Sequence, residues 1–194
     1  MITRVTYKDV TVQTFRSIKP DGAPQDPVTL FLAGDDWVKD ITVYLFNRTN
    51  QTIVQGAFNF SFPETTNWST HFRAVFPLNL GRIPDWALYD HGRAVRQVQG
   101  SKQPLSFGPG QIMAIHLGDY IEKIKADVEP TRPLAALTQM EIGLAGFFFT
   151  DELEWSGSFR VLDPQTLTWV RKSEFYPGDQ DSRWPGRPGW PGQQ

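Results

Sequence analysis

The chain has 194 residues, of which 40% are hydrophobic and 21% charged, a composition that is ordinary for a globular protein. Its 19 Lys and Arg against 21 Asp and Glu give a formal net charge of -2. The basic excess that is typical of nucleic-acid binders is missing, so nucleic acid is not expected as a partner. The absence of cysteine excludes disulfides, thiolate metal sites and cysteine nucleophiles.

The N-terminus and the longest apolar run together predict a soluble protein. Residues 1–9 contain no apolar stretch of the kind that signal peptides carry. Residues 144–149, the longest apolar run, are too few to span a bilayer. We therefore expect no membrane span and, by default, a cytoplasmic protein, or an exported one if the chain is a trimmed mature form.

Aromatic residues make up 13% of the chain, and Gly and Pro interrupt it at short intervals, which favours many short strands. The first strands are expected at 10–15 and 28–32. In both 41–46 and 54–62 the side chains alternate in character with a period of two, which is typical of strands. The polar residues 47–51 separate the two runs. This pattern predicts a β-hairpin with a five-residue loop.

A further strand is predicted over 72–78. The apolar residues Phe72, Ala74, Phe76 and Leu78 fall on one side of it. The alternation weakens over 81–109, where we expect a long excursion with one or two short strands. Residues 107–110 predict a tight turn, because Gly and Pro supply the φ values that such turns need. Another strand is expected at 112–117.

One short helix is predicted after this strand. Asp119 is a candidate cap, and Glu122, three residues later, completes a capping box. Ile121, Ile124 and Val128 then fall on one face, as in an amphipathic helix. A strand fits the same segment nearly as well.

The last unit is expected to be a second hairpin. Residues 140–149 are apolar on both faces, as in a central strand. After a three-residue turn, residues 153–161 return as one strand, with Trp155 pointing inward and Glu154 outward. A final edge strand is predicted at 167–172.

Seven to nine short strands with at most one short helix predict an all-β fold, an antiparallel β-sandwich of the immunoglobulin-like type. A barrel is the alternative, which pattern alone separates poorly from a sandwich. We expect a single domain over residues 1–176. Residues 177–194 are rich in Trp, Pro and Gly and have almost no aliphatic side chains to bury, so they are predicted to form a disordered tail.

The final hairpin carries a recurring signature. Residues 147–157, with the Asp-Pro pair at 163–164 and then Trp169, resemble uncharacterised bacterial proteins, acidobacterial ones among them, that have V-x-F-x-D-G-T-x-W-x-x-G followed by R-x-D-P and a Trp. The resemblance spans about residues 28–169 and implies a bacterial β-sandwich without an established activity. Glu152 stands where the signature has glycine, at a turn position where φ above zero favours glycine.

Acidic residues cluster at the final turn. Asp151, Glu152 and Glu154 offer carboxylate oxygens, which calcium prefers as ligands. A solvated turn is the interpretation we favour, because calcium loops supply more oxygens at tighter spacing. The three histidines show no metal-ligand spacing, and the sequence contains no serine-hydrolase or phosphate-loop motif. We expect no catalytic residue, no cofactor and no metal ion.

The seven tryptophans offer candidates for binding. Trp155 is expected in the core, whereas Trp68 and Trp86 lie in polar, loop-like segments where an exposed ring could stack on a sugar or a partner. Trp184 and Trp190 lie in the tail, which could dock on another protein as an extended ligand. A solvated terminus is the simpler interpretation of the tail.

These patterns predict a non-enzymatic β-sandwich that acts as an interaction or structural module, with a protein or a glycan as partner. A carbohydrate-binding module that uses loop aromatics is the alternative, and a glycan-active enzyme comes third. Exposed coplanar rings would favour the second hypothesis, and two carboxyl groups facing each other across a groove would favour the third. A polar surface with an exposed edge strand would favour the first.

Overall fold

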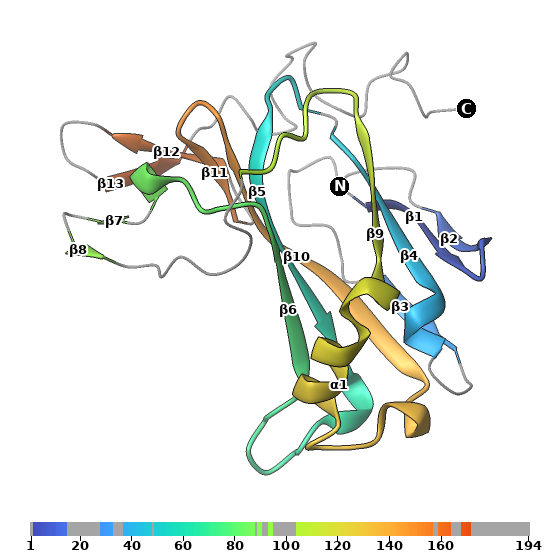
Figure 1. The fold of residues 1–194 in the computed structure, drawn as a ribbon. Helices are drawn as coiled ribbons and strands as arrows, with labels where there is room; N and C mark the ends of the chain where they lie inside the picture. Colours follow the sequence, from blue (N-terminus) through green and yellow to red (C-terminus); the bar gives the residue numbers. More distant parts are fainter. Residues whose placement is uncertain are drawn as a thin grey trace.

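The computed structural model describes residues 2–14, 28–32, 37–47, 49–87, 89–90, 93–94, 104–156, 159–163 and 168–171. These residues form two large antiparallel sheets, a small two-stranded sheet and one short α-helix (Figure 1). The predicted all-β fold with at most one short helix is therefore confirmed. None of the helices in the described part of the chain is long and apolar enough to cross a membrane.

The first sheet joins the N-terminus to two distant strands. Its order is β2-β1-β4-β9, and the strands are β1 (Ile2–Tyr7), β2 (Val10–Thr14), β4 (Ile41–Phe46) and β9 (Ile112–His116). Strand β1 was not predicted from the sequence pattern. Its neighbouring residues Val5 and Thr6 are both buried, and the register shifts between them, so the alternation that marks a strand is absent.

The second sheet has the order β13-β12-β11-β10-β5-β6, with β3 paired to the other end of β10. Its strands are β3 (Val28–Phe31), β5 (Ile53–Ser61), β6 (Val75–Leu80), β10 (Gln139–Phe149), β11 (Leu153–Trp155), β12 (Phe159–Asp163) and β13 (Thr168–Arg171). The predicted central strand is confirmed, since β10 pairs with β5 on one side and with β3 and β11 on the other. The excursion after β6 contains β7 (Tyr89–Asp90) and β8 (Arg93–Ala94).

The hairpin predicted over residues 41–62 is wrong. Both strands exist, but β4 pairs with β1 and β9, whereas β5 pairs with β10 and β6. The chain crosses from one sheet to the other at Asn47, which is 1% exposed. The Asn47 side-chain amide donates hydrogen bonds to the carbonyls of Gln51 (2.8 Å) and Phe107 (2.7 Å). These bonds fix a crossing where the polar loop of a hairpin was expected.

The second predicted hairpin, β10 with β11, is confirmed, and Phe147 lies opposite Trp155. The return segment at 153–161, however, is two strands, because β11 ends at Trp155 and pairs antiparallel with β12. Glu152 in the turn has φ of 55° although it is not glycine. Glu152 therefore adopts the left-handed conformation that usually favours glycine in a turn.

Glu154 does not point outward as predicted, because it is only 4% exposed. It lies opposite Phe148 in the β10–β11 pair. The ring of Trp86, from the 3-10 helix η3 (Asp85–Ala87), packs edge-on against Phe148, with the ring centroids 5.5 Å apart. The segment after β6 therefore covers the face of the hairpin that was predicted to be exposed to solvent.

The two sheets enclose a single hydrophobic core. The first sheet contributes Val5, Ile41, Val43, Leu45 and Ile115, and the second contributes Leu30, Phe58, Phe60, Phe76, Leu78, Met140 and Ile142. Trp37, in the 3-10 helix η1 (Trp37–Asp40), is fully buried and donates its indole N–H to the carbonyl of Leu137 at 2.8 Å. The arrangement is the two-layer, sandwich-like one that the strand pattern predicted.

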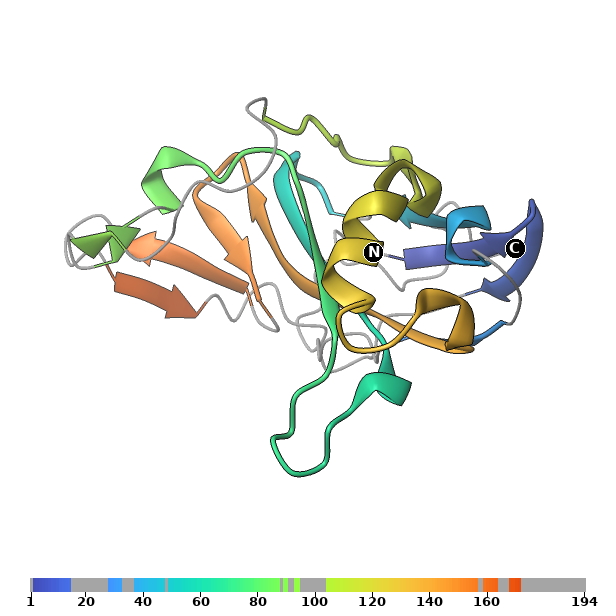
Figure 2. The same ribbon diagram turned by 60° about the horizontal axis from the view of Figure 1, so that its bottom comes forward.

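The predicted helix exists as α1 (Ile121–Val128), but it begins after Asp119. A 3-10 helix, η4 (Leu117–Tyr120), precedes it and supplies the Gly118 carbonyl as acceptor to the first helical amide. The N-cap residue of α1 makes no side-chain hydrogen bond, so the capping box predicted with Glu122 is absent. Figure 2 shows the helix lying between β6 and the first sheet, where its apolar face is buried.

Candidate binding surfaces

The structure does not bring the two predicted binding tryptophans, Trp68 and Trp86, together. Trp68 lies on the loop before β6 and Trp86 lies in η3 after it, so the two rings occupy opposite ends of that strand (Figure 1). Asp151 is exposed at the tip of the β10–β11 turn, next to Thr150, which lines the same hollow as Trp86. Trp184 and Trp190, together with the disorder predicted for 177–194, lie outside the described residues.

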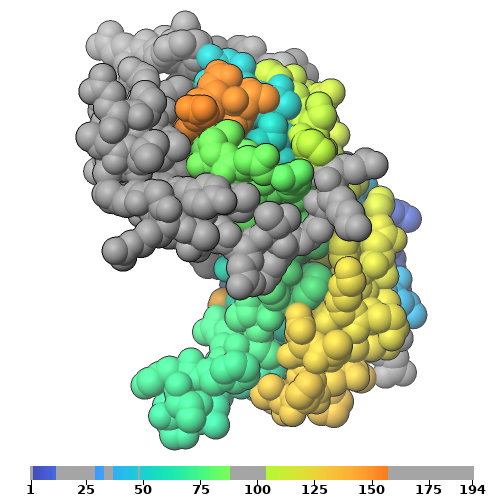
Figure 3. Space-filling view, turned by 60° about the vertical axis from the view of Figure 1, so that its left-hand side comes forward, coloured from blue at the N-terminus to red at the C-terminus, as the bar shows by residue number. Residues whose placement is uncertain are grey.

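The loop between β5 and β6 projects from the body of the molecule. Figure 3 shows this teal-green segment as a projection at the lower left. Near its tip, Trp68 is 82% exposed and Phe72 is 58% exposed. The prediction that Phe72 lies on a buried strand face is wrong, because β6 begins only at Val75.

Short hydrogen bonds hold the tip of this loop. The side-chain oxygen Oδ1 of Asn67 accepts from the N–H (3.0 Å) and hydroxyl (2.7 Å) of Ser69 and from the N–H of Thr70 (3.3 Å). The Asn67 N–H donates to the carbonyl of Phe72 at 2.8 Å. The tip is thus an Asx turn closed by a backbone bridge, and these hydrogen bonds order the backbone that carries Trp68 and Phe72.

The base of the loop is anchored to the start of β10. The Glu64 carboxylate accepts hydrogen bonds from the N–H groups of Thr138 (2.6 Å) and Gln139 (2.8 Å). Arg73 forms an ion pair with Glu141 at 2.6 Å on the other side. Both ends of the loop are therefore tied to the same strand.

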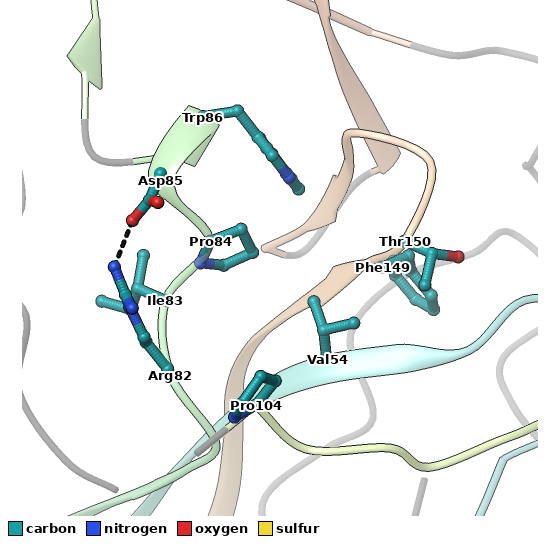
Figure 4. Close-up of a pocket in the computed structure, with 9 residues that line it drawn as sticks. All are labelled: Val54, Arg82, Ile83, Pro84, Asp85, Trp86, Pro104, Phe149 and Thr150. Atoms are coloured by element: carbon teal, nitrogen blue, oxygen red, sulfur yellow. Dashed lines mark hydrogen bonds and ion pairs between the residues drawn. The ribbon is translucent and has the colours of Figure 1, made fainter. Parts of the chain in front are cut away.

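A hollow of about 310 Å³ lies at the other end of β6 (Figure 4). Trp86 and Pro84 form one part of its wall, and Val54, Pro104 and Phe149 form another. Trp86 is half-buried, so part of its ring remains accessible from the hollow. The lining is mainly apolar, which suits rings and aliphatic groups better than ions.

An ion pair borders this hollow. Arg82 and Asp85, which flank Pro84 in sequence, form a salt bridge, and their side chains are 44% and 77% exposed. Figure 4 shows the pair on the opposite side of η3 from the Trp86 ring. It adds a charged rim to an apolar site.

The acidic residues at the final turn do not form a metal site. Asp151 and Glu152 are exposed, whereas Glu154 is buried on the covered face of the hairpin. No group of three or more His, Asp or Glu side chains within the described ranges could hold a metal ion. His116 lies on β9, where its ring nitrogen Nδ1 forms a hydrogen bond with the Thr42 hydroxyl at 3.0 Å.

The outer strand β9 is an exposed edge. It pairs with β4 and, as far as the structure describes the chain, with no other strand. Ile112 at its start is 69% exposed, and β9 contains neither a Lys nor a Pro, residues that commonly guard such edges.

Trp68 was predicted from the sequence as a candidate binding residue, but Phe72 was not predicted to lie beside it on the loop. Period-two alternation assigned Phe72 to the buried face of a strand. The signal that could have corrected this is the Asn-x-Ser-Thr stretch at 67–70, which favours an Asx turn and a later start of the strand.

The chain matches no family model, no curated protein and no solved structure. The resemblance of the final hairpin to bacterial proteins stays a prediction.

Proposed function

We propose that this protein is a non-enzymatic interaction module that binds a partner protein through the tip of the β5–β6 loop. The observation that carries the proposal is the exposure of Trp68 and Phe72 on a backbone held by its own hydrogen bonds. Classification as immunoglobulin-like and a bacterial origin belong to the same proposal and rest on the sequence pattern alone.

Two exposed rings on a rigid tip suit protein recognition in energy as well as in shape. Aromatic side chains bury about 150–250 Å² each, and at about 25 cal/mol per Å² the pair offers on the order of 10 kcal/mol before the costs of association. Trp is also enriched among the residues that dominate binding energy at interfaces. Because hydrogen bonds already order the tip, less conformational entropy is lost on binding.

The chemistry of the tip defines the surface it would fit. Residues 66–72 contain no Asp, Glu, Lys or Arg. We therefore expect the partner to offer an apolar pocket with neutral polar groups at its rim. A highly charged partner surface would lose its own hydration without gaining an ion pair.

The alternative is a carbohydrate-binding module in which a sugar stacks on Trp68. A glycan-active enzyme finds less support, because the carboxylates near this loop are engaged in structure. Glu64 accepts the amides of β10, and Glu141 pairs with Arg73.

The test uses two matched double variants. Trp68→Ala with Phe72→Ala removes the rings of the tip, whereas Val10→Ala with Phe31→Ala removes two side chains that are 67% and 72% exposed on other strands. A photo-crosslinking residue in place of His71, which is exposed and makes none of the hydrogen bonds of the tip described above, captures the partner, which is then identified, purified and titrated against each variant.

We expect the purified partner to bind the wild-type protein and the control variant with equal affinity, and the tip variant at least 100-fold more weakly, which corresponds to about 2.8 kcal/mol. Equal affinity for both variants would overturn the proposal. Binding to an arrayed glycan that disappears in the tip variant, in the absence of a protein partner, would favour the carbohydrate-binding alternative instead.

A further inference from the structure

We propose that the hollow beside Trp86 binds the chain's own C-terminal segment, residues 184–192, as an extended peptide. The hollow and the loop tip lie at opposite ends of β6. This inference is therefore independent of the function proposed above.

The hollow has the composition of a site for proline-rich peptides. Trp86 and Pro84 bring an aromatic ring and a pyrrolidine ring to one side, and Pro104 adds a second pyrrolidine ring beside Val54 on the other (Figure 4). Domains that recognise polyproline II helices use aromatic-lined grooves, in which proline rings pack against aromatic rings. Such a ligand needs few hydrogen bonds from the site, because its backbone stays solvated.

The C-terminal segment fits this chemistry in its period as well as its composition. Residues 184–192 read Trp-Pro-Gly-Arg-Pro-Gly-Trp-Pro-Gly, so Pro recurs at every third position. A polyproline II helix has three residues per turn, which would place the three prolines on one face and Trp, Arg and Trp on the next. The Gly positions leave the third face without side chains, so it can approach a wall closely.

Charge supports the same pairing. Arg187 stands at the centre of the segment, between its two tryptophans. The Asp85 side chain at the border of the hollow is 77% exposed. A second cation beside Asp85 would share the carboxylate that Arg82 contacts, and it would fix the position of the segment along the hollow.

The connecting chain has the right length. The last described strand, β13, ends at Arg171 in the same sheet as β10 and β5, which help to line the hollow. Three strand spacings separate β13 from β10, about 14 Å. The 12 residues at 172–183 would span about 17–21 Å as a flexible chain. A short linker gives an effective concentration in the millimolar range, so a contact of about millimolar affinity would be occupied about half of the time.

The absence of cysteine makes a direct test possible in the full chain. Gly192→Cys provides one attachment point for a nitroxide, which broadens the NMR signals of nearby protons. We expect strong broadening of the Trp86 indole N–H signal, and much weaker broadening of the Trp68 signal at the other end of β6. A Trp86 signal of equal intensity with the nitroxide oxidised and reduced would overturn the proposal.

Two controls define the occupant. Replacing the prolines at 185, 188 and 191 by Ser keeps the length, the label and both tail tryptophans, and should reduce the broadening of the Trp86 signal at least threefold. Unchanged broadening would contradict recognition of the repeat. A mixture of spin-labelled chain with isotope-labelled chain lacking the nitroxide should show no broadening at Trp86. Broadening in that mixture would place the tail of a second copy in the hollow and overturn the intramolecular arrangement.

Discussion

Asn47 and Asn67 begin the same local motif but are predicted to differ in their effect on stability. In each, Oδ1 accepts the N–H and the hydroxyl of the residue two positions later, Thr49 or Ser69. Asn47 is buried and also bonds to the carbonyl of Phe107, 60 residues away in sequence, whereas Asn67 is exposed.

We expect Asn47→Ala to lower the free energy of unfolding by about 2–3 kcal/mol, because buried carbonyl and amide groups lose their partners. Asn67→Ala should lower it by less than about 1 kcal/mol, since water replaces the lost bonds at an exposed tip. Urea unfolding followed by Trp fluorescence measures both values. Equal losses would mean that Asn47 does not hold the crossing between the sheets.

Gly81 and Gly110 form a second matched pair, because both have positive φ, 77° and 73°. A Cβ on Gly81 would lie 2.7 Å from the Leu105 Cβ, where the chain packs against the hydrogen bond from the Leu105 N–H to the Val54 carbonyl. A Cβ on Gly110 would meet nothing within 4 Å.

Substitution by Ala should therefore separate conformational strain from a steric clash. Gly110→Ala is predicted to cost about 1 kcal/mol through its positive φ alone. Gly81→Ala should cost about 2–4 kcal/mol, because the backbone must also move. Denaturation midpoints of the two variants, compared with the wild-type protein, give the difference. A smaller loss for Gly81→Ala than for Gly110→Ala would contradict the close packing at the end of β6.

At the scale of elements, Glu64 joins the loop after β5 to the start of β10. Partial burial alone would raise the pKa of its carboxyl, but the N–H groups of Thr138 and Gln139, the Thr138 hydroxyl and the charge of Arg132 outweigh burial and lower the pKa. A pKa lowered by folding adds stability above the unfolded value, about 4.3 for Glu, and this stability is lost as the pH falls through the folded value.

Glu64→Gln is therefore predicted to be less stable than the wild-type protein at neutral pH. The difference should shrink as the pH falls below about 4, where the wild-type carboxyl is protonated as well. Unfolding free energies from pH 3 to 7 measure the trend, with Glu122→Gln on the exposed side of α1 as a control for net charge. A difference that is constant over this range would show that Glu64 does not act through its charge.

Strand positions could be predicted from the sequence more fully than strand partners. The bounds of β4 were predicted correctly and those of β5 to within one residue, because alternation of side chains marks the two faces of a strand. Alternation carries no information on which strand lies alongside, so the two were wrongly joined as a hairpin. The deciding contact, between Asn47 and Phe107, spans 60 residues and has no local signal.

The binding surfaces divide in the same way. Polar neighbours predicted that Trp68 would be exposed, and the structure places it at the tip of a projecting loop. The hollow beside Trp86 was not predictable, because Val54, Pro104 and Phe149 reach it from three separate segments. Phe72 was misplaced because strand alternation and an Asx turn compete over the same few residues.

On the scale of the whole molecule, the Phe and Trp side chains of β5, β6, β10 and the β5–β6 loop fall into two groups. Most Phe rings of β5, β6 and β10 are buried in one core, as at Phe60, which is fully buried. Trp68 and Phe72 stand apart from that core on the projecting loop (Figure 3). If these two rings serve recognition, folding should not depend on them.

The most direct test of this account is the free energy of unfolding of the Trp68→Ala, Phe72→Ala double variant, measured beside Phe60→Ala. We predict that the tip variant stays within about 0.5 kcal/mol of the wild-type protein, as substitutions at exposed sites generally do. Phe60→Ala should lose about 3–5 kcal/mol, since it leaves a cavity in the core. A loss above about 2 kcal/mol in the tip variant would show that the rings pack within the protein and would contradict their assignment to a partner.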